Sequence, residues 1–376
     1  MLASLLSPIA EALDFAIAMT WEILWALVLG FALSAVVQAV ISKGEMIRLL
    51  PDDSPRSLAI ACGLGAASSS CSYAAIAIGR SLFAKGASAA VMLAFQFAST
   101  NLVWELGLVL WVLLGWQFTL AEFVGGAVLI VLMSLVLRVF ISPRLEAEAR
   151  KHAQHAEGGH DHPRAEGGLT WKQRVRSVDA WTDVAANFVA DWKMLWKEIT
   201  LGFFLAGFIG LLGNDFFNGL FITDGPSWLR TIENVIIGPV IAVLSFVCSI
   251  GNVPLAAVLW SGGISFAGVL AFIFADLIVL PIVLAYRKYY GWKFAWRISV
   301  MMFGVIVVAA LIVDGLFGLA GIIPTTRPSR ADVFGTVEVD YKLFLNILGV
   351  IIFATLFWLT RRRTQHAHAA HAEHAH

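Results

Sequence analysis

Long apolar stretches separated by short polar segments make up most of the chain. A helix that crosses a bilayer needs about 20 consecutive, mostly apolar residues. We predict about seven full membrane-spanning helices, one in each of the windows 15–42, 87–114, 119–141, 199–221, 264–286, 296–323 and 341–360. The first 14 residues lack a basic region and a small-residue cleavage site, so we expect a short interfacial helix there and not a removed signal peptide.

Two further segments, 57–86 and 232–262, are apolar at both ends and polar in the middle. Their centres read Ser-Ser-Ser-Cys-Ser-Tyr and Cys-Ser-Ile-Gly-Asn. Each is too short for two spans and too interrupted for one. Non-helical backbone inside a bilayer is tolerated only where protein buries it or where it lines a wet cavity. The pattern therefore predicts two re-entrant helical hairpins.

The two hairpin segments belong to an internal repeat. A shift of 177 residues places Cys248 on Cys71 and Ser249 on Ser72. The match continues through an apolar run and, after one deleted residue, aligns the sequence GWKF at 291 with GWQF at 115. Each half is then predicted to contain a helix, a broken segment and two further helices.

Lysines and arginines set the predicted orientation, because cytoplasmic loops are enriched in them. They cluster near 43–56, 138–197, 287–297 and 361–363. All four clusters lie on the cytoplasmic side only if each hairpin re-enters the side from which it came. The amino terminus is then outside, the carboxyl terminus is cytoplasmic, and the halves are inverted relative to each other, as in many secondary carriers.

This reading divides the chain into successive segments. A first repeat at 1–141 is followed by a cytoplasmic loop and interfacial helix at 142–197 and a second repeat at 198–323. The remainder is an external loop at 324–340, a last membrane helix at 341–363 and a His-rich cytoplasmic tail at 364–376. The fold class is all-α and polytopic, with inverted repeats.

Composition agrees with a membrane protein: 59% of the 376 residues are hydrophobic, 14% are charged and the formal net charge is zero. No nucleotide-binding P-loop, HExxH or GxSxG motif occurs, so we expect neither an enzyme nor transport driven by the chain's own ATP hydrolysis. No cofactor and no nucleic-acid partner are predicted. Three cysteines in apolar sequence imply no disulfide framework.

The two hairpin tips are the candidate substrate site. Thiols suit a soft metal or metalloid, whereas hydroxyls, amides and the free N–H groups of helix N-termini suit an oxyanion. A purely structural role, in which small residues allow close helix packing, is the alternative. The candidate substrate-binding residues are Cys71, Cys248, Ser70, Ser72, Ser249, Asn252 and Asn101.

Acidic residues inside predicted spans are the candidate coupling groups, because ionised side chains in hydrocarbon are costly and usually functional. Glu105 and Asp276 are assigned proton coupling. Glu105 follows Asn101 by four residues, so both would share one face of a continuous helix. Glu22 and Glu122 are placed near helix ends, where a solvated role is expected.

All nine histidines lie outside the predicted spans, in the 142–197 loop and in the tail. Such runs bind Zn, Ni or Cu weakly without fixing one coordination geometry, and they are also typical of polar linkers. The residues are His152, His155, His160, His162, His366, His368, His371, His374 and His376.

The cysteine-bearing segments, together with FASTNLVWELG and SFAGVLAFIFADLIVLPI, resemble the ArsP-type permease family over about residues 15–360. The resemblance implies a bacterial permease, and the best understood members of the family are similar to exporters of trivalent organoarsenicals. The family's cysteine motifs fall on Cys71 and Cys248. Many relatives have Cys-x-Cys or Cys-Gly in the first motif, where this chain has Ser70, Cys71 and Ser72.

The sequence therefore predicts a multi-pass permease of a bacterial plasma membrane that exports a small soft metal, metalloid or organoarsenical by alternating access. One alternative is a carrier of a small anion held by serine hydroxyls and half-helix N-termini. Another is a membrane metal-handling or scaffold protein that acts through its His-rich segments. Membrane lipid and the solute are the expected partners, and homo-oligomerisation is left open.

Overall fold

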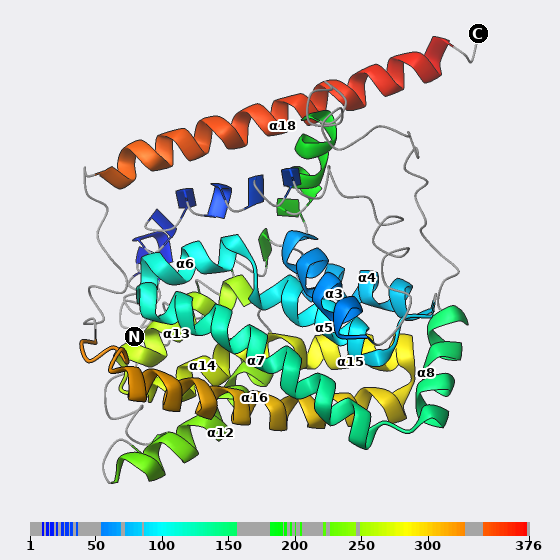
Figure 1. The fold of residues 1–376 in the computed structure, drawn as a ribbon. Coiled ribbons are helices and arrows are strands. Elements are labelled where there is room, and N and C mark those ends of the chain that lie inside the picture. Colours follow the sequence, from blue (N-terminus) through cyan, green and yellow to red (C-terminus); the bar gives the residue numbers. More distant parts are fainter. Residues whose placement is uncertain are drawn as a thin grey trace, which may run out of the picture.

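The computed structural model describes residues 54–68, 72–84, 86–155, 181–190, 226–245, 249–327 and 341–373, with scattered residues between 10 and 36 and between 192 and 222. Every regular element in these ranges is helical (Figure 1). The elements of the first half are α3 (Pro55–Ser68), α4 (Ser72–Ala84), α5 (Ala89–Asn101), α6 (Trp104–Leu114), α7 (Trp116–Phe140) and α8 (Pro143–His155). Those of the second half are α12 (Ser227–Ser245), α13 (Ser249–Ser261), α14 (Phe266–Phe274), the 3₁₀ helix η1 (Ala275–Ile278), α15 (Leu280–Tyr290), α16 (Trp292–Ala320) and α18 (Tyr341–Glu373).

The helix boundaries repeat at the same shift as the sequence. Moved by 177 residues, α4 coincides with α13, and α5 coincides with α14 plus η1. Ser88 and Ser265 each cap the next helix by accepting a hydrogen bond from a backbone N–H three residues on. Gly115 and Gly291, with φ of 94° and 83°, begin α7 and α16 after the one-residue deletion. Positive φ favours glycine, which explains why both halves keep it at this turn.

Each interrupted segment folds back on itself as a helical hairpin. The end of α3 lies beside the end of α5, where the hydroxyls of Ser68 and Ser99 are 3.1 Å apart. The chain then returns along α4, whose Leu82 packs with Ala61 of α3 and Val91 of α5 in one apolar cluster. In the second half α12 packs along α14 in the same way that α3 packs along α5.

Contacts between the halves are reciprocal. α4 packs against α15, and its counterpart α13 packs against α6, the counterpart of α15. The aromatic contacts follow the same rule: Phe118 meets Trp260 at 5.2 Å between ring centroids, and the equivalent rings Phe294 and Phe83 meet at 5.9 Å. Exchanging the halves leaves this set of contacts unchanged, as a two-fold axis would require. The direction of that axis relative to a membrane stays a prediction.

Among the described residues, five helices are long and apolar enough to cross a membrane, or six if the bent pair α5 and α6 counts as one span. The predicted windows 15–42 and 199–221 lie largely outside the described residues, so the count of seven stays a prediction. α12 begins at Ser227, five residues before the predicted hairpin, and residues Ser227–Leu244 alone are long enough to span. The second hairpin is therefore longer on its first arm than the sequence indicated.

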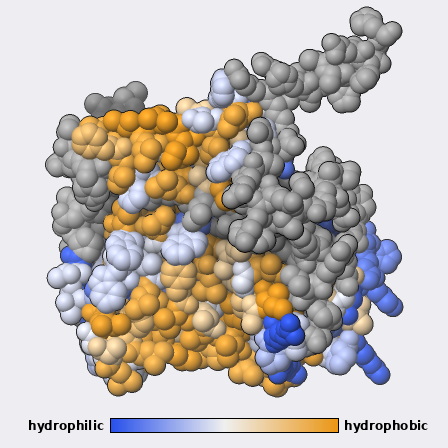
Figure 2. All heavy atoms as spheres, turned by 45° about the horizontal axis from the view of Figure 1, so that its top comes forward, coloured by the Kyte–Doolittle hydropathy of each residue, from blue (hydrophilic) through white to orange (hydrophobic). Residues whose placement is uncertain are grey.

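The outer surface of the helices is apolar, as a lipid-facing surface must be. Outside the grey parts, Figure 2 shows mostly apolar residues on this face, with hydrophilic residues gathered at its right-hand edge and fewer at its left. Large apolar side chains such as Val131, Val139, Val300 and Leu319 are exposed on α7 and α16. Burying these groups in hydrocarbon removes the unfavourable contact with water. The chain is a multi-pass membrane protein.

The last helix packs on segments far away in the sequence. The Asn346 amide donates to Trp21 O at 2.8 Å and accepts from Trp25 N at 3.0 Å. On the same helix, Phe353 contacts Phe188 and Trp192 at ring-centroid distances of 5.7 and 5.2 Å. The segment that was expected to lie at the membrane interface, 169–197, therefore buries part of its apolar face against α18.

Candidate functional site

The hairpin tips themselves, residues 69–71 and 246–248, lie outside the described residues, and with them Ser70, Cys71 and Cys248. The residue that follows each cysteine is described. Ser72 is the first residue of α4 and Ser249 the first residue of α13, and both side chains are buried.

Both serines converge on Asp276, which comes from η1 and is fully buried. The Ser72 hydroxyl donates to Asp276 Oδ2 at 3.1 Å across 204 residues of sequence. The hydroxyls of Ser249 and Thr100 also face this carboxyl. The N-termini of α4 and α13 thus point at one acidic group, and their dipoles favour its negative charge. Residues next to the two tips are brought together here.

Asp276 lies at a break in its span. After α14 the chain tightens into η1, and Val279 then adopts an extended conformation (φ −60°, ψ 147°). Pro281 has no backbone N–H and fits the first turn of α15, so a new helix starts there. The first half breaks at the matching place: Val103 is extended (φ −116°, ψ 146°), and α5 and α6 meet at 43°. Broken spans of this kind expose backbone polar groups at membrane depth.

The break changes one expectation from the sequence. Asn101 and Glu105 were predicted to share a face of one continuous helix, but Asn101 ends α5 and Glu105 lies in the first turn of α6. Asn101 donates to Phe97 O at 3.1 Å and to the Thr100 hydroxyl at 2.9 Å, so its amide is turned back toward α5. Both residues are buried, and the structure places them on different helices.

Asn252 is fully buried in the first turn of α13, close in sequence to Ser249. Because α13 packs against α6, the helix of Glu105 and the helix of Asn252 are neighbours. The predicted set therefore divides into a described core of Ser72, Ser249, Asn252 and Asp276 near the tips, with Asn101 and Glu105 beside it.

The prediction of a solvated role for Glu122 was wrong. The residue was expected to be solvated near a helix end, but it is 0% exposed, in the second turn of α7. Its environment is set by the packing of α7 on α5 and α14, which no local pattern reveals. Glu22 lies outside the described residues.

Tyr286 and Gln96 form a buried polar contact that was not expected. The Tyr286 hydroxyl donates to Gln96 Oε1 at 2.9 Å and so joins α15 to α5. Gln96 lies one turn before Thr100 on the same helix, so polar side chains continue along α5 away from Asp276. The link between the two halves is therefore polar over more than one helical turn.

The family model described as "Predicted permease", ArsP_1, matches residues 8–315. This chain belongs to the ArsP_1 permease family. The protein named "Putative permease Rv2963" of Mycobacterium tuberculosis (strain ATCC 25618 / H37Rv) is 46% identical over 324 residues, which are 84% of this chain and 79% of that protein. No solved structure matches the chain. The resemblance seen in the sequence is confirmed, and permease membership indicates a membrane transporter rather than an enzyme.

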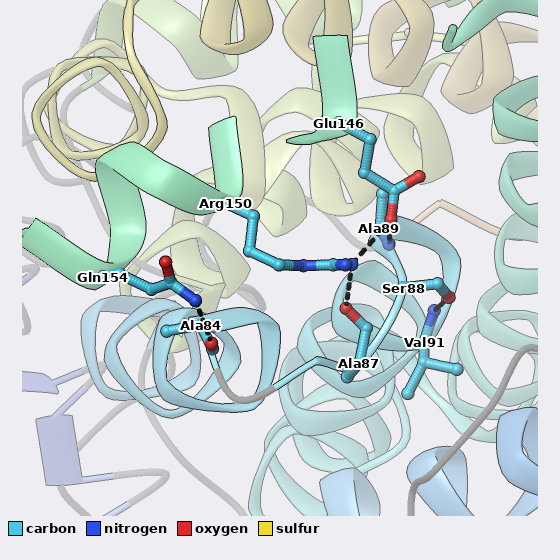
Figure 3. A network of polar contacts seen from close by, with 8 residues as sticks. All are labelled: Ala84, Ala87, Ser88, Ala89, Val91, Glu146, Arg150 and Gln154. Atoms are coloured by element: carbon cyan, nitrogen blue, oxygen red, sulfur yellow. Dashed lines mark hydrogen bonds and ion pairs between the residues drawn. The ribbon is translucent and has the colours of Figure 1, made fainter. Parts of the chain in front are cut away.

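In this ArsP_1 permease, α8 contacts the end of the first hairpin that lies away from its tip (Figure 3). Arg150 donates to Ala87 O at 2.9 Å, and its guanidinium lies 4.9 Å from the centre of the Phe83 ring. Gln154 donates to Ala84 O at 3.0 Å. Ala84 ends α4, so its carbonyl is one that the helix itself leaves without a partner, and Ala87 lies in the connection to α5.

The second hairpin of the permease has the equivalent arrangement. Arg327 stacks 3.8 Å from the centre of the Trp260 ring and donates to Trp260 O. The repeat relates Trp260 to Phe83, whereas the two arginines come from different places: Arg150 lies on α8 and Arg327 follows the end of α16. We call these two arrangements the arginine clamps. Burial and the neighbouring Arg230 lower the pKa of Arg327 to about 10, so its guanidinium remains charged at neutral pH.

Of the permease's histidines, His152 and His155 are described, both on α8. The His155 ring is 2.7 Å from Lys151 O, and the His152 ring lies against Gly291 at the start of α16. No group of three or more metal-binding side chains occurs in the described part of the chain. The other histidine side chains, in the loop and the tail, lie outside it, so weak metal binding there stays a prediction.

Proposed function

We propose that this permease is a secondary carrier of the bacterial plasma membrane that exports a small soft metal, metalloid or organoarsenical by alternating access. Its two halves would be inverted relative to the membrane, with the amino terminus outside and the carboxyl terminus in the cytoplasm. One observation carries the proposal: the residues that follow Cys71 and Cys248, which are Ser72 and Ser249, converge on the buried Asp276.

The arrangement suits a thiophilic cargo. A cysteine adjacent to each of these serines would lie at the amino end of a half-helix, where the dipole favours the thiolate form that binds soft ions. Ser70, Ser72, Ser249, Asn252 and Asn101 would supply the polar remainder of the cavity. Reciprocal contacts between the halves provide two equivalent gating elements, which alternating access requires.

A second candidate is a carrier of a small anion, and the convergence of two helix N-termini favours it. Asp276 opposes it, because a fixed carboxylate where both N-termini point repels a second negative charge. A soft metal cation or a neutral arsenical carries no negative charge, so the soft-ion proposal avoids this repulsion between cargo and Asp276.

The experiment uses inside-out vesicles and measures uptake of a trivalent phenylarsenical, with and without a pH gradient. The variant combines Cys71→Ser with Cys248→Ser, and Cys62→Ser is the matched control, because Cys62 lies in α3 away from the tip. We expect loss of uptake in the double variant only. Full uptake by the double variant would exclude the thiols, and arsenate competition insensitive to thiol reagents would favour the anion carrier.

A further inference from the structure

Glu122 is a buried acidic residue that the proposed substrate site does not use. Its side chain is 0% exposed, and neither carboxyl oxygen has a hydrogen-bond partner among the described residues. Moving an ionised carboxylate from water to such a place costs roughly several kcal/mol of desolvation free energy. Natural proteins keep a group of this kind for a purpose, or keep it neutral.

The face of α7 that carries Glu122 points at the broken spans. Gly126, one turn further on, lies against Asn101 and Leu102, and Gly125 lies against the Phe274 ring. Phe274 is two residues before Asp276. Glu122 is close enough to Asp276 for their charges to interact, and Asp276 Oδ1 also lacks a partner among the described residues.

The two carboxyls have unequal surroundings. Asp276 accepts a hydrogen bond from the Ser72 hydroxyl and faces the hydroxyls of Thr100 and Ser249. All three groups stabilise a negative charge on its carboxyl. Glu122 has no such donor. Neither forms an ion pair with a described lysine or arginine. Because two buried like charges repel, the charge belongs on Asp276 and the proton on Glu122.

Other titratable groups on the elements around α7 do not alter this assignment. Glu105 on α6 and Asp314 on α16 are acidic, so neither can supply a positive charge to Glu122. Lys293 and Arg297, at the start of α16, are exposed. The Tyr286 hydroxyl on α15 already donates a hydrogen bond to Gln96. α5 and α14 carry no ionisable side chain.

A proton suits Glu122 better than a metal cation does. Hard cations such as Na⁺ or Ca²⁺ are bound by several converging oxygens. No described hydroxyl or amide group forms a hydrogen bond with the Glu122 carboxyl. A proton needs only one oxygen, and its release would restore the repulsion between Glu122 and Asp276.

We infer that Glu122, rather than Asp276 as the sequence suggested, binds the proton whose movement drives transport, with Asp276 as its more readily ionised neighbour; the inference rests on the proposed carrier function. In one state of the carrier the Glu122 carboxylate takes a proton from one side of the membrane. In the other state it releases that proton to the opposite side. Repulsion from Asp276 makes the deprotonated form unstable unless cargo or a conformational change compensates for it.

The first test does not depend on the cargo. Infrared difference spectra of the purified full-length protein at neutral pH, in light and heavy water, report protonated carboxyl groups. We expect a band that moves when glutamate is ¹³C-labelled and disappears in Glu122→Gln. It should persist in Glu148→Gln, a control on the exposed face of α8. Absence of the band in the wild type, or its persistence in Glu122→Gln, would overturn the inference. If the variant folds poorly, the ¹³C-labelled wild type still shows whether any glutamate is protonated.

The second test uses proteoliposomes and the trivalent phenylarsenical. Glu122→Gln should lose accumulation driven by a pH gradient but keep exchange of labelled for unlabelled arsenical, because exchange needs no net proton movement. Gradient-driven accumulation equal to wild type would refute the role of Glu122. If the wild type exchanges no arsenical, the proposed cargo fails, and the infrared result still decides the proton site.

Discussion

The arginine clamps allow a quantitative prediction, because each consists of several defined contacts. Changing Arg150 to Ala removes the stacking on Phe83, the hydrogen bond to Ala87 O and the 3.0 Å ion pair with Glu146. The Arg150 side chain is 30% exposed, so its ion pair contributes only about 0.3 kcal/mol. The stacking contributes about 1 kcal/mol, and the charged hydrogen bond contributes about 1.5 kcal/mol.

We therefore expect Arg150→Ala to lose about 2–3 kcal/mol of stability. Arg327→Ala should lose less, about 1 kcal/mol, because Arg327 is more exposed and Arg230 repels it. The assay is thermal unfolding in detergent, monitored with a thiol-reactive dye that reports exposure of the three native cysteines. Tm should fall in the order wild type, Arg327→Ala, Arg150→Ala.

The control is Arg144→Ala, which removes an exposed arginine from the same helix. Its Tm should match that of wild type. If Arg150→Ala unfolded at the temperature of Arg144→Ala, the clamp on the first hairpin would contribute nothing, and the reasoning from its contacts would be wrong.

Three further predictions concern the core and the tail. Ser72→Ala removes the 3.1 Å donor to Asp276 and should lower transport more than Ser57→Ala, a buried serine far from the tip; equal transport rates in vesicles would contradict this. Gly238→Leu should abolish accumulation of folded protein, measured by size-exclusion chromatography of a fluorescent fusion, because its Cβ would lie 2.5 Å from Gly268 O; a normal peak would show that α12 moves away. Deletion of 364–376 should leave transport near normal, and its loss would favour the metal-handling role of the His-rich tail.

Much of the fold was predictable because it follows from short-range patterns. The windows of apolar residues located α7, α16 and α18, and the polar interruptions located the ends of α3 and α12. The polar helix α8 was not predicted. The repeat also aligned Gly291 with Gly115, and the structure shows a turn of the same kind at both, as it shows equivalent caps at Ser88 and Ser265. These features depend on side-chain transfer energy and backbone preference, which act within a few residues.

Other features were not predictable because they depend on the path of the backbone. A continuous helix through Asn101 and Glu105 was a sound reading of an apolar window, yet the break at Val103 separates them. No residue near Val103 is a strong helix breaker, so the local sequence carries no warning. In the second half Pro281 does mark the break, and the repeat transfers that signal only after both halves are aligned.

The sequence by itself determined that this chain is a helical membrane permease with an internal repeat and two polar interruptions, because hydrophobicity and repetition are written residue by residue. Only the tertiary structure decided which polar groups share an interior. It brought Ser72, Thr100 and Ser249 to Asp276 from three separate elements, and it buried Glu122 where the sequence suggested solvent. Burial is a property of the neighbours that a helix acquires on folding, and for α7 those neighbours include α14 and α16, which lie in the other half of the chain.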